Sequence, residues 1–112
     1  MIDMPWPPSV NHYYTVARGR KILSKRGRDY KRTAGLEILA QKPAKHKGRI
    51  SINIHAHPPN RRKRDLDNLL KPCLDVLVET GIISDDSDIN DLRIQKFPPV
   101  KAGYLKIWIE SW

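Results

Sequence analysis

The sequence predicts an α+β fold (mixed α/β), in which a mixed sheet is packed by two helices, and three observations support this class. Residues 49–57 alternate between apolar and polar side chains, which is typical of a half-buried strand. Residues 66–78 carry apolar side chains at helical spacing. Two more strands are expected at 92–97 and 104–110. We therefore predict a single small domain over 1–112, with the order β-α-β-α-β-β.

The N-terminal part should begin with a stiff extended segment over residues 4–11, because three prolines there fix φ and lack an N–H. Residues 12–28 combine many basic side chains with two glycines and are expected to form an exposed, partly mobile loop. Ser24 is a candidate N-cap for a first helix over residues 25–41, which the Lys42-Pro43 pair ends.

The second helix contains a proline, Pro72, inside its apolar pattern. Proline costs about 3 kcal/mol in a helix interior and is tolerated in the first turn. Either the regular helix therefore begins near Leu69, or it is kinked near Lys71. Residues 65–68 would then form a capping turn, and Gly81 is the expected C-terminal cap.

The charge distribution indicates a polyanionic partner. The chain has a formal net charge of +9, and such cationic surface suits nucleic-acid phosphates. Residues 1–64 hold 16 Lys and Arg against 3 Asp and Glu, whereas residues 65–112 hold 5 against 9. No apolar run approaches the ~18 residues that cross a bilayer, and no signal peptide is seen. With the lone Cys73, this favours a soluble, cytoplasmic protein without a membrane partner.

The basic and acidic halves meet in residues 61–71, where four consecutive cations precede Asp65-Leu66-Asp67-Asn68 and Lys71. Magnesium prefers oxygen ligands and keeps several waters, so two or three carboxylates suffice to hold it. Asp65 and Asp67 offer two, and the acidic loop over residues 82–91 is the other concentration of carboxylates. An EF-hand is excluded there, because Asp91 falls where that motif needs glycine.

Simpler interpretations of the same residues stay open. Asp65 could be an ordinary helix cap, and the basic run could be a solvated surface. Lys71 lies four residues after Asp67, and Asp75 and Glu79 continue the same helix face, so Lys71 could simply form a surface ion pair there. As a functional residue it would instead stabilise the negative charge that develops on a phosphate in the transition state.

Taken together, these motifs resemble the RusA-like crossover-junction endodeoxyribonucleases, which are small Holliday junction resolvases of bacteria and phages. The resemblance spans most of the chain and is specific as a combination of elements. Its residues are Pro5-Trp6-Pro7-Pro8-Ser9 with Asn11, Tyr13 and Tyr14; Ser24 with Tyr30; Arg64-Asp65-Leu66-Asp67-Asn68 with Lys71; Asp75; and Asp85-Asp86 after Gly81.

The resemblance implies a homodimer that binds magnesium through Asp65, Asp67 and Asp86, with Lys71 as a further catalytic residue and Mn²⁺ as a substitute metal. It also implies symmetric nicks in two opposed strands of branched DNA, the four-way junction. The candidate DNA-binding cations are Arg18, Arg20, Lys21, Arg26, Arg28, Arg61, Arg62, Lys63 and Arg64. The candidate supporting residues are Asn11, Asn68, Asp75 and Asp85.

Two other functions compete with junction resolution. A basic nucleic-acid-binding module without catalysis would show strongly salt-dependent binding and no magnesium-dependent nicking. A less selective nuclease would cut flaps or other branched DNA as readily as four-way junctions.

Overall fold

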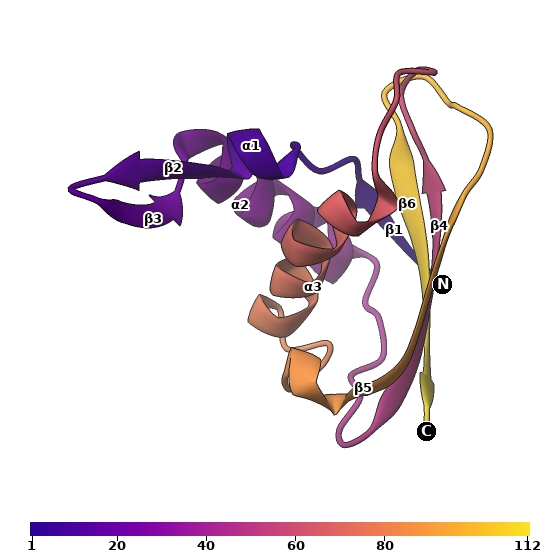
Figure 1. Cartoon of the computed structure of the whole chain (residues 1–112). Coiled ribbons are helices and arrows are strands. Elements are labelled where there is room, and N and C mark those ends of the chain that lie inside the picture. Colours follow the sequence, from indigo (N-terminus) through magenta and orange to yellow (C-terminus); the bar gives the residue numbers. More distant parts are fainter.

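The computed structural model describes all 112 residues and places a four-stranded sheet beside a layer of helices (Figure 1). This confirms the predicted α+β class with a mixed sheet. In chain order, the elements are β1 (Ile2–Pro5), α1 (Val10–Tyr13), β2 (Tyr14–Ala17), β3 (Arg20–Leu23), α2 (Lys25–Ala40), β4 (Ile50–His57), the 3₁₀ turn η1 (Leu66–Leu69), α3 (Leu70–Glu79), the 3₁₀ turn η2 (Asp86–Asp88), β5 (Ile89–Lys96) and β6 (Tyr104–Ser111).

The sheet has the strand order β1-β6-β4-β5, in which only the β4–β5 pair is parallel. Strand β1 lies at the edge, where a strand that ends in Pro5 loses no ladder hydrogen bond to a second neighbour. The parallel pair needs a crossover, and α3 supplies it between β4 and β5. The expected alternation in β4 is confirmed, because every second residue from Ile50 to Ala56 is buried.

The core lies between the sheet and the two longer helices. Ile38 of α2 and Leu77 of α3 are fully buried, as are Ile54 and Ile107 on the facing side of the sheet. Burying an aliphatic side chain of this size contributes about 1.5–3 kcal/mol relative to exposure. The core therefore fixes both helices against one sheet face. No helix in the chain is long and apolar enough to span a membrane.

The boundaries of α3 agree with the predicted start and stop signals. The α-helix begins at Leu70, so Pro72 is its third residue and lies in the first turn, where its missing N–H costs nothing. At the other end Gly81 has φ +78°, and its N–H donates to the Val78 carbonyl at 3.0 Å. The N–H of Ile82 donates to Leu77 at 3.0 Å, which completes a Schellman motif.

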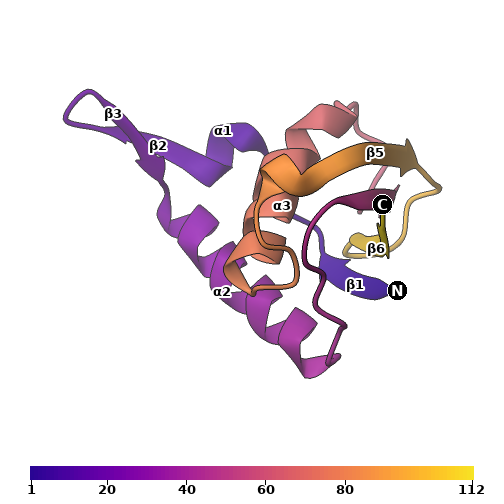
Figure 2. The ribbon, with the colours of Figure 1, turned by 90° about the horizontal axis from the view of Figure 1, so that it is seen from below.

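The prediction that residues 12–28 are exposed is largely confirmed, but the prediction that they form a loop is wrong. The predicted element order lacks the hairpin and the short helix found there. The hairpin β2–β3 occupies residues 14–23 and projects away from the body of the domain (Figures 1 and 2). Its turn residues Arg18 and Gly19 have φ values of +53° and +73°, the left-handed pair of a two-residue hairpin turn. The short helix α1 precedes it, so the N-terminal extended segment ends before Val10.

A close backbone contact fixes this N-terminal unit to α2. The side chain of Ser24, the predicted cap of α2, accepts from Gly27 N–H at 3.0 Å, and its backbone N–H donates to the Tyr13 carbonyl at 2.9 Å. A Cβ at Gly27 would lie only 2.4 Å from the Tyr13 carbonyl oxygen. Glycine is therefore required here by the close approach of α1 to α2.

Two glycine substitutions in α2 should have opposite effects. Gly27→Ala should lower the free energy of unfolding by at least 1–3 kcal/mol, roughly the cost of overpacking, because its Cβ overlaps Tyr13. Gly35→Ala should leave stability unchanged or raise it by up to about 1 kcal/mol, because its Cβ meets only Thr80 Cγ2 at 3.5 Å. Urea denaturation of both variants measures the difference. Equal effects would show that α1 does not press against α2.

Candidate functional site

The predicted site residues lie at both ends of α3 and along one side of it. The turn η1 precedes the helix and carries Asp67, with Asp65 just before it. The turn η2 follows the helix and packs against it, and it carries Asp86. Lys71 and Asp75 project from the first two turns of α3 itself. The helix start and the 3₁₀ turns therefore determine where the candidate carboxylates lie.

The two carboxylates of the Asp-x-Asp motif have no ion-pair partner in the chain. Asp65 has extended backbone (φ −89°, ψ 129°), and its side chain makes no capping hydrogen bond to η1. Asp67 is exposed and, like Asp65, takes part in no ion pair. The interpretation of Asp65 as an ordinary helix cap is thus not supported by the geometry. Both side chains leave their oxygens free for an external ligand.

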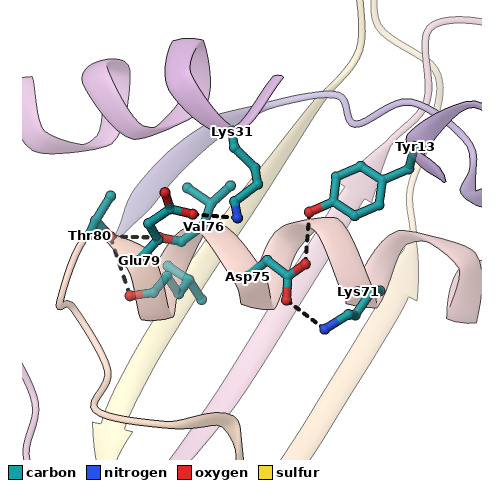
Figure 3. Close-up of polar contacts among 8 residues, drawn as sticks. Tyr13, Lys31, Lys71, Asp75, Val76, Glu79 and Thr80 are labelled. Atoms are coloured by element: carbon teal, nitrogen blue, oxygen red, sulfur yellow. Dashed lines mark hydrogen bonds and ion pairs between the residues drawn. The ribbon is translucent and has the colours of Figure 1, made fainter. Parts of the chain in front are cut away.

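Lys71 belongs to a small hydrogen-bonded network with Asp75 and Tyr13 (Figure 3). Its Nζ donates to Asp75 Oδ1 at 2.8 Å, which confirms the ion pair that the shared helix face predicts between these two residues. The buried Tyr13 donates its hydroxyl proton to Asp75 Oδ2 at 2.7 Å. Asp75 therefore holds Lys71 from one side and is itself held by α1 from the other.

The network alters the acid–base behaviour of two of its members. The hydrogen bond to Asp75 raises the pKa of Lys71, and the negative charge of Asp86 adds to that effect. Burial, followed by the hydrogen bond to Asp75, raises the pKa of Tyr13 well above its usual range. Lys71 thus stays a cation, and Tyr13 stays a neutral donor, throughout the physiological pH range.

The structure separates the roles of the two adjacent aspartates in η2. Asp85 accepts hydrogen bonds from the N–H and hydroxyl of Ser87, which lower its pKa, so it caps the turn. Both aspartates line a surface cavity of about 420 Å³ together with Lys71 and Asp75, but the carboxylate of Asp86 makes no side-chain hydrogen bond. Of this pair, Asp86 is therefore the one whose carboxylate stays free, and its charge raises the pKa of Lys71.

Not all of the predicted ligand set comes together. No three Asp, Glu, His or Cys side chains lie close enough to one another to hold a metal ion. Asp65 and Asn68 line a different and larger cavity from the one that Asp86 lines. Magnesium is often held by only one or two carboxylates, with water and substrate phosphate completing the octahedron. The free oxygens of Asp65 and Asp67 fit that mode of binding by their donor type.

The candidate DNA-binding cations fall into three groups. Three lie on the projecting hairpin, two near the start of α2, and four in the loop between β4 and η1. Two of them also have structural roles: Arg28 donates to the Leu23 carbonyl at 2.9 Å, and Arg64 donates to the carbonyls of Asn60 and Arg62. The exposed groups are Arg18, Arg20 and Lys21; Arg26 and Arg28; and Arg61, Arg62, Lys63 and the half-buried Arg64.

Some contacts of the site were not predicted from the sequence. The Tyr13–Asp75 contact joins residues 62 positions apart, so no local pattern signals it. Trp6 and Pro59 line the same cavity as Asp65, although only their proximity in space connects them. Asn11, a candidate supporting residue, is exposed on α1.

Comparison with known proteins supports the resemblance seen in the motifs. A family model described as "Endodeoxyribonuclease RusA" matches residues 5–110. Proteins named "Crossover junction endodeoxyribonuclease RusA" from Shigella sonnei and Escherichia coli K12 are each 40% identical over 115 residues, which cover 96% of this chain and 91% of theirs. The protein of the same name from Enterobacteria phage 82 is 39% identical with the same coverage.

Changes in the Tyr13–Asp75–Lys71 network should alter the pKa of Lys71. Asp75→Asn should lower that pKa toward its ordinary value, because the carboxylate that accepts the ammonium proton is lost. Tyr13→Phe should leave the ion pair intact and change this pKa less. An NMR titration of the Lys71 side chain between pH 8 and about 12 measures both. An unchanged pKa in Asp75→Asn would contradict the network.

Proposed function

The chain belongs to the RusA family of endodeoxyribonucleases, and on that premise we propose that it is a magnesium-dependent, structure-selective DNA endonuclease. Its substrate would be the four-way Holliday junction, which it would resolve by paired symmetric nicks in DNA recombination and repair. One observation carries the proposal most directly: Asp65 and Asp67 keep free carboxylates at the end of a four-residue basic run. Phosphate attraction and metal-binding oxygens therefore occur at one place.

In this proposal the chain's own residues divide the work of strand cleavage. The cations of the loop between β4 and η1 bind the DNA phosphates. Asp65 and Asp67 would hold Mg²⁺, or Mn²⁺ in its place, with substrate phosphate and water as further ligands. Asp86, the third ligand that the resemblance implies, lines the cavity beside Lys71. When bound, the metal would offset negative charge on the phosphate and favour deprotonation of a water. Lys71, a cation held by Asp75, would stabilise the extra charge of the transition state.

A four-way junction needs two incisions in opposed strands, whereas one chain offers one such set of residues. We therefore propose a homodimer with two-fold symmetry, because a two-fold axis supplies two equivalent sites for a substrate that has the same symmetry. Sedimentation equilibrium of the protein without DNA would give the subunit number. A monomer both free and junction-bound would oppose paired nicking by one assembly.

The other two functions make different demands on the same residues. A non-catalytic binding module would use the cations and would have no use for unpaired carboxylates among them. A less selective branched-DNA nuclease would keep the carboxylates and Lys71 but would not need two coupled sites. The uncommitted aspartates favour an enzyme over the binding module, and substrate comparison decides between the two enzymes.

Asp67→Asn should reduce nicking of a synthetic four-way junction on the order of 10²-fold or more, because one metal-binding oxygen becomes an amide. Junction affinity should stay equal or rise, since the same change removes a negative charge near the phosphates. Asp3→Asn is a matched control, because it makes the same charge change on the exposed edge strand β1. Loss of binding together with cleavage, or retained cleavage, would count against the assignment.

Cleavage should require a divalent metal and should depend on DNA branching. We expect nicks on the four-way junction with Mg²⁺ or Mn²⁺ and none with EDTA, because the carboxylates alone cannot activate water. Rates on a flap and on linear duplex should be lower by about 10-fold or more, which corresponds to a barrier difference of roughly 1.4 kcal/mol. Equal rates on flap and junction would favour the less selective nuclease, and nicking in EDTA would exclude the metal mechanism.

A further inference from the structure

A cavity of about 900 Å³ lies where the N-terminal segment, the start of α2 and the basic loop before η1 converge. Trp6 and neighbouring prolines supply apolar surface to it, and cations from two separate elements supply its polar part. Asp65, the first carboxylate of the Asp-x-Asp motif, also lines it. The cavity therefore opens directly beside the candidate cleavage site.

The apolar part of the cavity is rigid. Trp6 is half-buried and packs against the hydrophobic core, and the following Pro7 is buried. Prolines before and after Trp6 fix the backbone, so little conformational entropy remains to be lost when a ligand binds. The Arg64 guanidinium lies 5.7 Å from the centre of the Trp6 ring, within the range of a cation–π contact. The guanidinium lies over the Trp6 ring, and the two planar groups together suit another π-system, because an arginine plane also stacks on aromatic faces.

Two cations and an amide in the polar part of the cavity are exposed and free to bind a ligand. Arg26 and Lys63 are exposed, and neither takes part in an ion pair. Asn68 likewise presents an exposed amide, which can both donate and accept hydrogen bonds. Two free cations suit a phosphate, and an amide beside an aromatic ring suits the edge of a nucleobase.

We propose that this cavity binds a single unstacked nucleotide of the strand that is cut. The base would stack against Trp6, Asn68 would contact the base edge, and Arg26 and Lys63 would bind the adjoining phosphate. The inference rests on the proposed nuclease function and deepens it by naming the element of the DNA that is recognised. A base at a branch point suits this cavity better than a base in duplex, because it is already partly free of its neighbours.

If Trp6 only filled the core and the cations only solvated the surface, the arrangement of the cavity would be unexplained. A tryptophan that only filled the core would not need to line an open cavity of about 900 Å³. Cations that only kept the surface soluble would not need to converge from α2 and from the loop before η1. The Trp6 platform and the free cations of the cavity are instead the combination found in proteins that bind single-stranded nucleic acid.

Photocrosslinking tests the contact without relying on cleavage. Four-way junctions that carry 5-iodouracil at single positions along the strand to be cut would be irradiated with the protein in EDTA, and the modified residue identified by mass spectrometry. We expect Trp6 to crosslink at one or two adjacent positions. Crosslinks to Trp108, which contacts His55 within the sheet, or to no aromatic residue, would overturn the proposal.

An affinity cycle on the same junctions separates recognition from folding. Trp6→Leu should weaken binding between about 5- and 150-fold, the range for loss of one base–aromatic stack, while Trp6→Phe should retain most of the affinity. An abasic nucleotide at the crosslinking position should weaken wild-type binding to a similar extent and should hardly change binding by Trp6→Leu. Trp108→Leu is the matched control, and its affinity should equal that of wild type.

Each outcome has a defined meaning. If the abasic nucleotide weakens wild type and Trp6→Leu equally, Trp6 acts only through the fold and the proposal fails. If wild type does not nick a junction in Mg²⁺ but the crosslink and the cycle hold, the proposed nuclease function fails while the nucleotide site stands. If wild type nicks the junction but Trp6 neither crosslinks nor couples to the abasic position, the nucleotide site alone is refuted.

Discussion

Pro72 sets where α3 begins, and the position of the Asp-x-Asp motif depends on that start. A proline is tolerated only in the first helical turn, so the α-helix cannot extend back past the region of Leu70. The preceding residues therefore form an extended segment and a 3₁₀ turn. In a continuous helix Asp67 would lie directly above Lys71 and could pair with it. The 3₁₀ turn leaves Asp67 free, and Lys71 pairs with Asp75 instead.

Asp75 connects helix α3 to the short helix α1 and to the hairpin that follows it. It accepts one hydrogen bond from Lys71 and one from Tyr13, so the same carboxylate restrains the candidate catalytic lysine and the helix α1. Tyr13 is in turn held against α2 by Gly27 and by the cap Ser24. The hairpin β2–β3 begins at the very next residue. The basic hairpin, whose cations are candidate DNA contacts, is thus connected to Lys71 through the buried Tyr13 and the half-buried Asp75.

The sequence predicted what local patterns encode and missed what depends on distant residues. Alternation from Ile50 to Ala56 predicted β4, and helical spacing with Gly81 predicted α3 and its end. The hairpin escaped notice because it has no buried face: Val16 is 73% exposed and Ile22 43%, so no alternation marks it. The Tyr13–Asp75 bond and the Trp6 cavity unite residues that are far apart in the chain.

Asp65 and Asp67 carry negative charges that no cation of the chain neutralises, and this links metal binding to DNA binding. Four cations immediately precede them, yet neither forms an ion pair, and an exposed pair would contribute only up to about 1 kcal/mol. The same cations attract phosphates, which would bring negative charge toward the two carboxylates. The negative phosphates and the negative carboxylates would then repel each other. A divalent cation between carboxylates and phosphate would turn this repulsion into attraction, so binding of DNA and binding of metal would favour one another.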